Sequence, residues 1–132
     1  MQFFIEVKRL TKRFVVQNTT LESDRLLCAL SDPLDGYNGL QASGRMLADS
    51  DRLSFIYIID SNEGYLYIEF PSDVWPNLKK GLDEKRDVFV VVGRETFLEL
   101  TNLRSGMIYL IDNIAENPNY GENMVTEVAK HF

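Results

Sequence analysis

Cysteine and histidine are almost absent from this sequence: Cys28 and His131 are the only residues of each kind. A single cysteine cannot form an internal disulfide bond, so the fold does not depend on an oxidising compartment. A structural zinc site needs four cysteine or histidine ligands, and two such residues cannot supply them. We therefore expect a cytosolic protein that carries no metal and no other cofactor.

Long apolar runs are also missing. The chain begins with an apolar stretch, Phe3, Phe4 and Ile5, but Glu6 and Lys8 interrupt it well before a signal-peptide core or a spanning helix could form. No later run reaches the length that a membrane-spanning helix needs. We expect no membrane partner.

Positive charge is in short supply, because 14 basic residues face 20 acidic ones and the formal net charge is −6. Such a balance repels polyanions, so nucleic acid is not an expected partner. The local exception is a basic cluster formed by Lys8, Arg9, Lys12 and Arg13. Its simpler interpretation is a solvated strand edge that charge protects from aggregation, and its alternative is an anion-binding patch.

Catalytic and nucleotide-binding motifs are absent as well. No GxxxxGK[ST] sequence occurs, and His131 is the penultimate residue, where holding a catalytic base in place is difficult. Cys28 lies among leucines and alanine, which predicts a buried and unreactive thiol. The carboxylate pairs lack calcium-loop spacing and suit turns better; they are Asp32, Asp35, Asp49 and Asp51. The sequence leans away from an enzyme, and an enzyme that works through these aspartates is the third hypothesis.

What the sequence does contain is the composition of one ordered domain over residues 1–132, with 45% hydrophobic and 26% charged residues. Strand-type runs occupy residues 3–8, 14–19, 25–30, 45–49, 53–59, 65–70, 87–92 and 96–100. Residues 31–39 concentrate turn formers and predict a loop, and residues 60–64 and 93–95 predict hairpin connections. Residues 53–59 are apolar on both faces, which indicates a central strand covered on both sides.

Three segments show the helical period. Val74, Leu78 and Leu82 mark the first, which Ser72 or Asp73 can cap and whose first turn tolerates Pro76. The second carries an apolar stripe of Met107, Leu110, Ile111 and Ile114, and the third presents Val125, Val128, Ala129 and Phe132 on one side. The expected fold is α+β: a mostly antiparallel sheet of about seven or eight strands packed with three helices, two of them C-terminal.

Aromatic residues are the remaining candidates for a binding role. Tyr65 and Tyr67 lie two residues apart on one predicted strand, and cross-strand core packing is their ordinary explanation. If both face solvent, they form a surface suited to a protein partner. The C-terminal stretch NPNYGENMVTEVAKHF is best interpreted as a structural clasp, that is, a segment whose helix packs against the sheet and closes the fold. Tyr120 within it is a third candidate for a partner contact.

Several of these motifs together resemble the YjbL-type family, a group of small uncharacterised proteins of Bacillus-like Gram-positive bacteria. The motifs are DSDRLSFIYIID, GYLYIEFP and IYLIDNIAENPNYGENMVTEVAKHF, with NYGE and the helix after it the most specific part. The resemblance covers residues 45–132 well and the first strands loosely, and the 31–39 loop is longer than the family pattern. It implies a cytosolic bacterial protein and transfers no activity or site residue.

Two functional hypotheses follow. The leading one is a non-enzymatic protein-interaction or adaptor module that binds another protein or associates with itself, with Tyr65, Tyr67 and Tyr120 as candidate contacts. The alternative is a regulatory domain that binds a small ligand or anion through Lys8, Arg9, Lys12 and Arg13.

Overall fold

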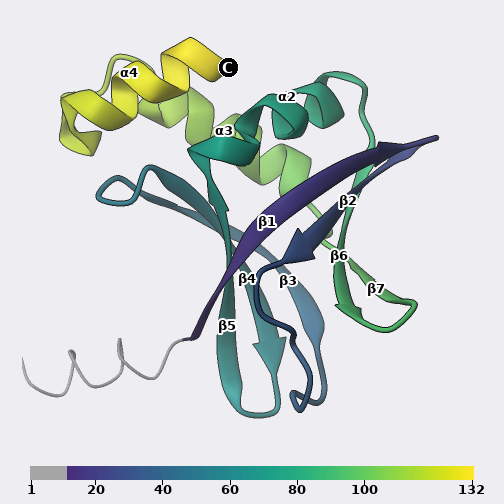
Figure 1. Ribbon diagram of the computed structural model, residues 1–132. Coiled ribbons are helices and arrows are strands. Elements are labelled where there is room, and N and C mark those ends of the chain that lie inside the picture. The colour runs from purple at the N-terminus through teal and green to yellow at the C-terminus, as the bar shows by residue number, and fades with distance from the viewer. Residues whose placement is uncertain (1–11) are drawn as a thin grey trace, which may run out of the picture.

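A computed structural model describes residues 12–132 of the chain (Figure 1). In chain order the elements are β1 (Lys12–Glu22), β2 (Arg25–Leu30), β3 (Gln41–Asp49), β4 (Ser54–Ser61), β5 (Gly64–Pro71), the 3-10 turn η1 (Ser72–Val74), α2 (Trp75–Asp83), β6 (Asp87–Gly93), β7 (Thr96–Glu99), α3 (Leu103–Ile114), the 3-10 turn η2 (Pro118–Tyr120) and α4 (Glu122–His131). The α+β class is confirmed, with two of the three α-helices near the C-terminus. The strand predicted over residues 3–8 lies outside the described residues.

The strands described between residues 12 and 132 form one sheet in the order β3-β4-β5-β1-β2-β6-β7. Four neighbouring pairs are antiparallel hairpins or short connections, β1–β2, β3–β4, β4–β5 and β6–β7. The pairs β1–β5 and β2–β6 are parallel, so the N-terminal hairpin lies in the middle of the sheet. The sheet curls until its edge strands β3 and β7 approach each other. It is mostly antiparallel, as predicted.

The hairpin of β4 and β5 lies between the edge strand β3 and the strand β1. Residues 54–59 of β4 are all buried, which confirms that this strand is covered on both sides. On β5, Leu66, Ile68 and Phe70 face the main core, whereas the alternate residues face away from it. Gly64 closes the hairpin with a φ of +112°, a conformation that favours glycine.

The three α-helices gather on one side of the sheet, while the β4–β5 hairpin extends away from them (Figure 1). Trp75, at the start of α2, joins the layers: its ring centroid lies 5.1 Å from that of Phe55 and 5.5 Å from that of Phe132. Its indole Nε1 donates a hydrogen bond of 2.9 Å to the carbonyl of Phe70. One continuous apolar core therefore links the sheet to both ends of the helical layer.

The start of the first helix differs from its prediction. Neither Ser72 nor Asp73 caps α2, because both residues belong to the 3-10 turn η1 that precedes the helix. Pro76 does occupy the first turn of α2, as expected. A proline is tolerated there because the first-turn N–H groups have no partner within the helix.

The last helix also departs from the predicted stripe. Met124 and Val128 are its buried residues, Val125 is half-buried and Ala129 is exposed. The two residues that face the core directly are therefore 124 and 128, which lie four apart on one side of the helix. The helix is nevertheless the expected clasp, since Val125, Val128 and Phe132 all pack against the core.

The sequence offered little to hold His131 in place at the end of the chain, whereas the structure leaves its side chain only 22% exposed. Its imidazole packs edge-on against Trp75, with ring centroids 5.4 Å apart. Its Nδ1 lies 3.0 Å from the carbonyl oxygen of Glu127. The end of α4 is therefore held against the core by an aromatic contact, which supports the clasp interpretation.

Candidate functional site

The predicted basic cluster is only partly described by the structure. Lys8 and Arg9 lie outside the described residues, and Lys12 is exposed at the start of β1. Arg13 follows on the face of the sheet opposite Phe14, which is buried in the core. The guanidinium of Arg13 donates to Glu69 Oε1 at 3.1 Å and lies 2.8 Å from Asp49 Oδ2. Its charge is therefore already matched by two carboxylates.

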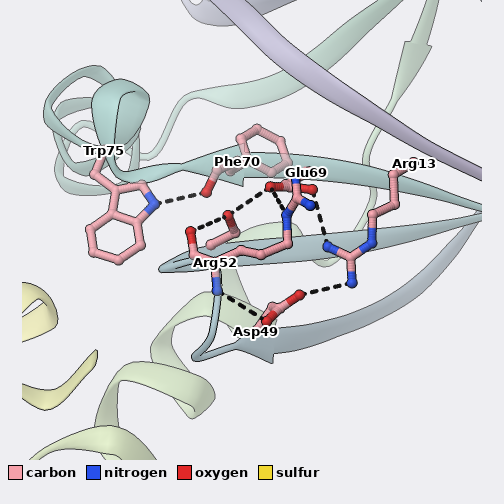
Figure 2. Close-up of polar contacts among 7 residues, drawn as sticks. Arg13, Asp49, Arg52, Glu69, Phe70 and Trp75 are labelled. Carbon is pink, nitrogen blue, oxygen red and sulfur yellow. Dashed lines mark hydrogen bonds and ion pairs between the residues drawn. The ribbon is translucent and has the colours of Figure 1, made fainter. Parts of the chain in front are cut away.

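Glu69 is the centre of this ion-pair network, which Figure 2 shows. Its side chain is only 3% exposed, although carboxylates are rarely buried without partners. Besides the bond from Arg13, it accepts hydrogen bonds from Arg52 Nε at 3.0 Å and from Ser54 Oγ at 2.9 Å. Asp49 joins the network as an acceptor of the Arg52 backbone N–H. We call these five residues, from β1, β3, β4, β5 and the β3–β4 turn, the Glu69 network.

Within the network, Arg13 has a pKa above its ordinary value. Partial burial lowers the pKa of this guanidinium, but hydrogen bonds to Asp49 and Glu69, together with the charges of both carboxylates, outweigh that effect. Two guanidinium groups balance two carboxylates, so the network satisfies its own charges. Its geometry is that of a cross-link between strands more than that of a receptor for an anion.

The three candidate tyrosines occupy different surroundings. Tyr65 is 55% exposed, and the guanidinium of Arg45 lies 5.1 Å from its ring centroid. Tyr67 is half-buried on the same face of β5, with Arg13 5.8 Å from its ring centroid. Tyr120 is half-buried against the core in η2. Tyr65 and Tyr67 therefore share one face, as the alternation predicts, but only Tyr65 presents most of its ring to solvent.

A groove between β3 and α3 is the feature that the sequence reasoning missed. It measures about 410 Å³ and is lined by Gly44, Arg45, Met46, Leu47, Ile58, Ser105, Gly106, Tyr109 and Leu110. Leu47 is 42% and Tyr109 is 67% exposed, and both are large apolar side chains in contact with water. We call this feature the β3–α3 groove. With Tyr65 beside Arg45, it gathers three of the five exposed large hydrophobic residues of the described chain.

Small residues give the β3–α3 groove its shape. A β-carbon at Gly106 would lie 3.1 Å from Met46 Cγ, so glycine lets α3 lie close beside β3. On the strand, the pairing register shifts between Ala42 and Met46, and Gly44 in this bulge has a φ of +76°. The Tyr57 hydroxyl accepts a bond from Gly44 N at 3.0 Å and donates one to Thr101 O at 2.7 Å. The bulge and the start of α3 are thus joined through one side chain.

The structure does not gather the four candidate aspartates in one cleft. Asp49 belongs to the Glu69 network, and Asp35 lines a hollow of about 310 Å³ beside the 31–39 loop. Asp32 and Asp51 are exposed. The loop itself is anchored, because Leu34 is 1% exposed within the core. Across residues 12–132, no group of three or more His, Cys, Asp or Glu residues is placed to hold a metal ion.

Cys28 is buried in β2, as the sequence predicted. Desolvation by burial raises the pKa of its thiol from 9.0 to about 12. We expect a thiol-specific disulfide reagent to leave the folded protein unmodified at mildly alkaline pH and to modify one thiol per chain after denaturation. Modification of the folded protein at the denatured rate would contradict this burial.

The same shift predicts how stability changes in alkali. The unfolded thiol loses its proton near pH 9.0, whereas the folded thiol keeps it to about pH 12. The stabilisation linked to this group is therefore complete below pH 9.0 and declines between these two pH values. The Cys28→Ser variant should lack this alkaline loss of stability, which urea titrations at a series of pH values would measure.

Comparisons with known proteins identify relatives of this chain but assign no function to it. No helix within the described part of the chain is long and apolar enough to cross a membrane. No solved structure matches the chain. Similar proteins occur in Bacillus velezensis, 37% identical over 84% of this chain and 90% of the relative, and in Halalkalibacterium halodurans, 41% identical over 70% and 74%. A relative from Bacillus cereus is 35% identical over 100% of this chain and 99% of its own.

All three relatives are described as UPF0738 proteins, and the profile of that family of unknown function matches residues 14–132. The expectation of a small uncharacterised family with members in Bacillus is confirmed, whereas the YjbL-type name is not. The chain belongs to the UPF0738 family.

Proposed function

We propose that this protein is a non-enzymatic protein-interaction module of the cytosol. The observation that carries the proposal is the β3–α3 groove, where Leu47 and Tyr109 are exposed beside Arg45 at the edge of the sheet. An apolar surface bordered by a charged residue is typical of a protein-binding site. The cytosolic location is supported by the single cysteine, which cannot form an internal disulfide.

The anion-binding alternative has less support from the geometry. Arg13 is held by Asp49 and Glu69, and Lys12 is the other basic residue of the predicted cluster that the structure describes. An added anion would compete with two carboxylates that already lie within ion-pair distance of Arg13. The interaction module therefore remains the better hypothesis.

A capture experiment with matched variants tests this function. The purified chain is immobilised and exposed to a whole-cell lysate of a Bacillus species, in parallel with the Leu47→Arg and Ile108→Arg variants. Ile108 is 41% exposed on α3 but does not line the groove, so it matches Leu47 in exposure. We expect the same proteins on the native chain and Ile108→Arg, and at least about tenfold less of them on Leu47→Arg.

Thermal unfolding by circular dichroism checks that both variants remain folded. Equal capture by the two variants, or no capture above background by the native chain, would count against an interaction role for the β3–α3 groove.

A further inference from the structure

We propose that the β3–α3 groove binds an extended peptide segment of another protein, which adds to β3 as a further strand and carries an apolar residue and an acidic residue two positions apart. This inference rests on the proposed interaction function and specifies its partner. It follows from the position of β3 at an edge of the sheet, the small residues on the helix side of the groove and the charge of Arg45.

The first step is the edge strand. In the sheet formed by residues 12–132, β3 pairs with β4 on one side, and no strand is hydrogen-bonded to its other side, although β7 approaches it. An edge strand presents backbone N–H and C=O groups that another extended chain can bind. Peptide recognition by strand addition uses these groups for affinity and the alternating side chains for specificity.

The second step is the small size of the residues on the helix side of the groove. α3 accompanies β3, with Gly106 close to Met46, and Ser105 and Gly106 place little side-chain bulk along this side of the groove. Tyr109 and Leu47 stand at its rim. A groove between an edge strand and a helix, with small residues on its helix side, suits an extended backbone better than a bulky partner element.

The same geometry argues against a second copy of this chain. In a symmetric pairing of two β3 strands, each copy would bring its own α3 to the shared edge. The two helices would then compete for the space beside one pair of strands, which are only about 4.8 Å apart. A segment without an accompanying helix avoids this conflict.

The third step is charge. Arg45 is exposed and stacks over Tyr65, and none of the ion pairs within residues 12–132 involves it. The Arg45 guanidinium at the groove is therefore available to an acidic group on a partner. A carboxylate opposite Arg45 would form a charge-assisted hydrogen bond.

Side-chain alternation then sets the spacing of the two peptide residues that face Arg45 and Leu47. Arg45 and Leu47 project from the same face of β3, opposite to the side of Met46. In an added strand, the residues opposite Leu47 and Arg45 are two positions apart, whichever way that strand runs. The peptide therefore carries an apolar and an acidic residue on either side of a small residue, which lies opposite Met46, where the helix at Gly106 approaches the strand closely.

Selection from random short peptides displayed on phage tests this inference with the full-length native chain as the target. We expect enrichment of sequences with an apolar residue two positions away from aspartate or glutamate. Synthetic versions of enriched peptides should bind the Arg45→Glu variant at least about tenfold more weakly, and replacing their acidic residue by lysine should restore binding to that variant. An Arg94→Glu variant, changed in the β6–β7 connection at a residue that does not line the groove, should bind like the native chain.

Backbone amide exchange of residues 45–49 should slow when a peptide is bound, which a contact through side chains alone would not produce. The inference is overturned if no peptide is enriched, if enriched peptides bind Arg45→Glu as tightly as the native chain, or if Leu47→Arg converts a native dimer to a monomer. If any of these results were obtained, capture of lysate proteins that depends on Leu47 would still support the proposed interaction function.

Discussion

Replacing Glu69 by glutamine is expected to lower the free energy of unfolding by about 2–4 kcal/mol. The change keeps the size of the side chain but removes the charge that Arg13 and Arg52 share. Removing one member of a buried ion pair leaves the other charge without compensation, and this loss is larger than the net contribution of the intact pair. Urea titration followed by far-ultraviolet circular dichroism measures the change.

The expected loss is smaller than that of a fully buried pair, because the arginines reach solvent. The side chain of Arg13 is 29% and that of Arg52 is 54% exposed, so water screens part of each unmatched charge. Arg52→Met should accordingly cost only about 1 kcal/mol. Glu63→Gln, in the exposed turn between β4 and β5, is the matched control and should leave stability unchanged. A Glu69→Gln protein as stable as this control would show that the Glu69 network does not stabilise the fold.

Ending the chain at Pro118 is expected to cost about 5 kcal/mol or more of stability, which is comparable with the whole stability of many domains. The deletion removes the buried Met124 and Val128, as well as the half-buried Phe132 that packs on Trp75 and Phe55. Trp75 is the only tryptophan of the chain, so its fluorescence reports the change directly. We expect a red-shifted emission and a lower urea midpoint, because water would reach an indole that is now fully buried.

Two point variants separate the role of the clasp from a general effect of truncation. Val128→Ala should cost about 1–3 kcal/mol, because it leaves a cavity beneath α4. Thr126→Ala, on the exposed side of the same helix, should be neutral. If the shortened chain unfolded at the same urea concentration as the whole, α4 would not be a structural clasp, and the tail would again be a candidate functional element.

The local elements of this fold could be predicted from the sequence because their signals are local. The β2 strand matches its predicted bounds, and the β4–β5 hairpin follows from two strand-type runs around a glycine-containing turn. The order of strands could not be predicted in this way. β1 pairs with β5 and β2 pairs with β6, and no residue pattern near β1 indicates partners that lie about 50 residues away in sequence.

The candidate site shows the same limit. Arg13 was singled out as part of a run of charges, but its function as a partner of Glu69 depends on the parallel pairing of β1 with β5. Glu69 alternates with Leu66, Ile68 and Phe70, a pattern that assigns it to a solvent-facing side. Its burial arises from side chains that other strands and turns supply.

The β3–α3 groove depends on tertiary structure in a further respect. Arg45 and Leu47 alternate along a strand, and Gly106 interrupts an apolar helix, but neither feature alone indicates a groove. Only the strand order places β3 at an edge, and only the packing of α3 brings Gly106 against Met46. A glycine within a helical stripe was the one signal in the sequence for a close approach of this kind.

The hydroxyl of Tyr57 lowers the entropic cost of binding in the β3–α3 groove, because it holds the two walls in place. By accepting from Gly44 N and donating to Thr101 O, it fixes the bulge of β3 relative to the start of α3 before any partner arrives. The conformational entropy of ordering the two walls is then lost during folding and not during association. A peptide that binds between them loses only its own freedom, so even a short segment can reach a useful affinity.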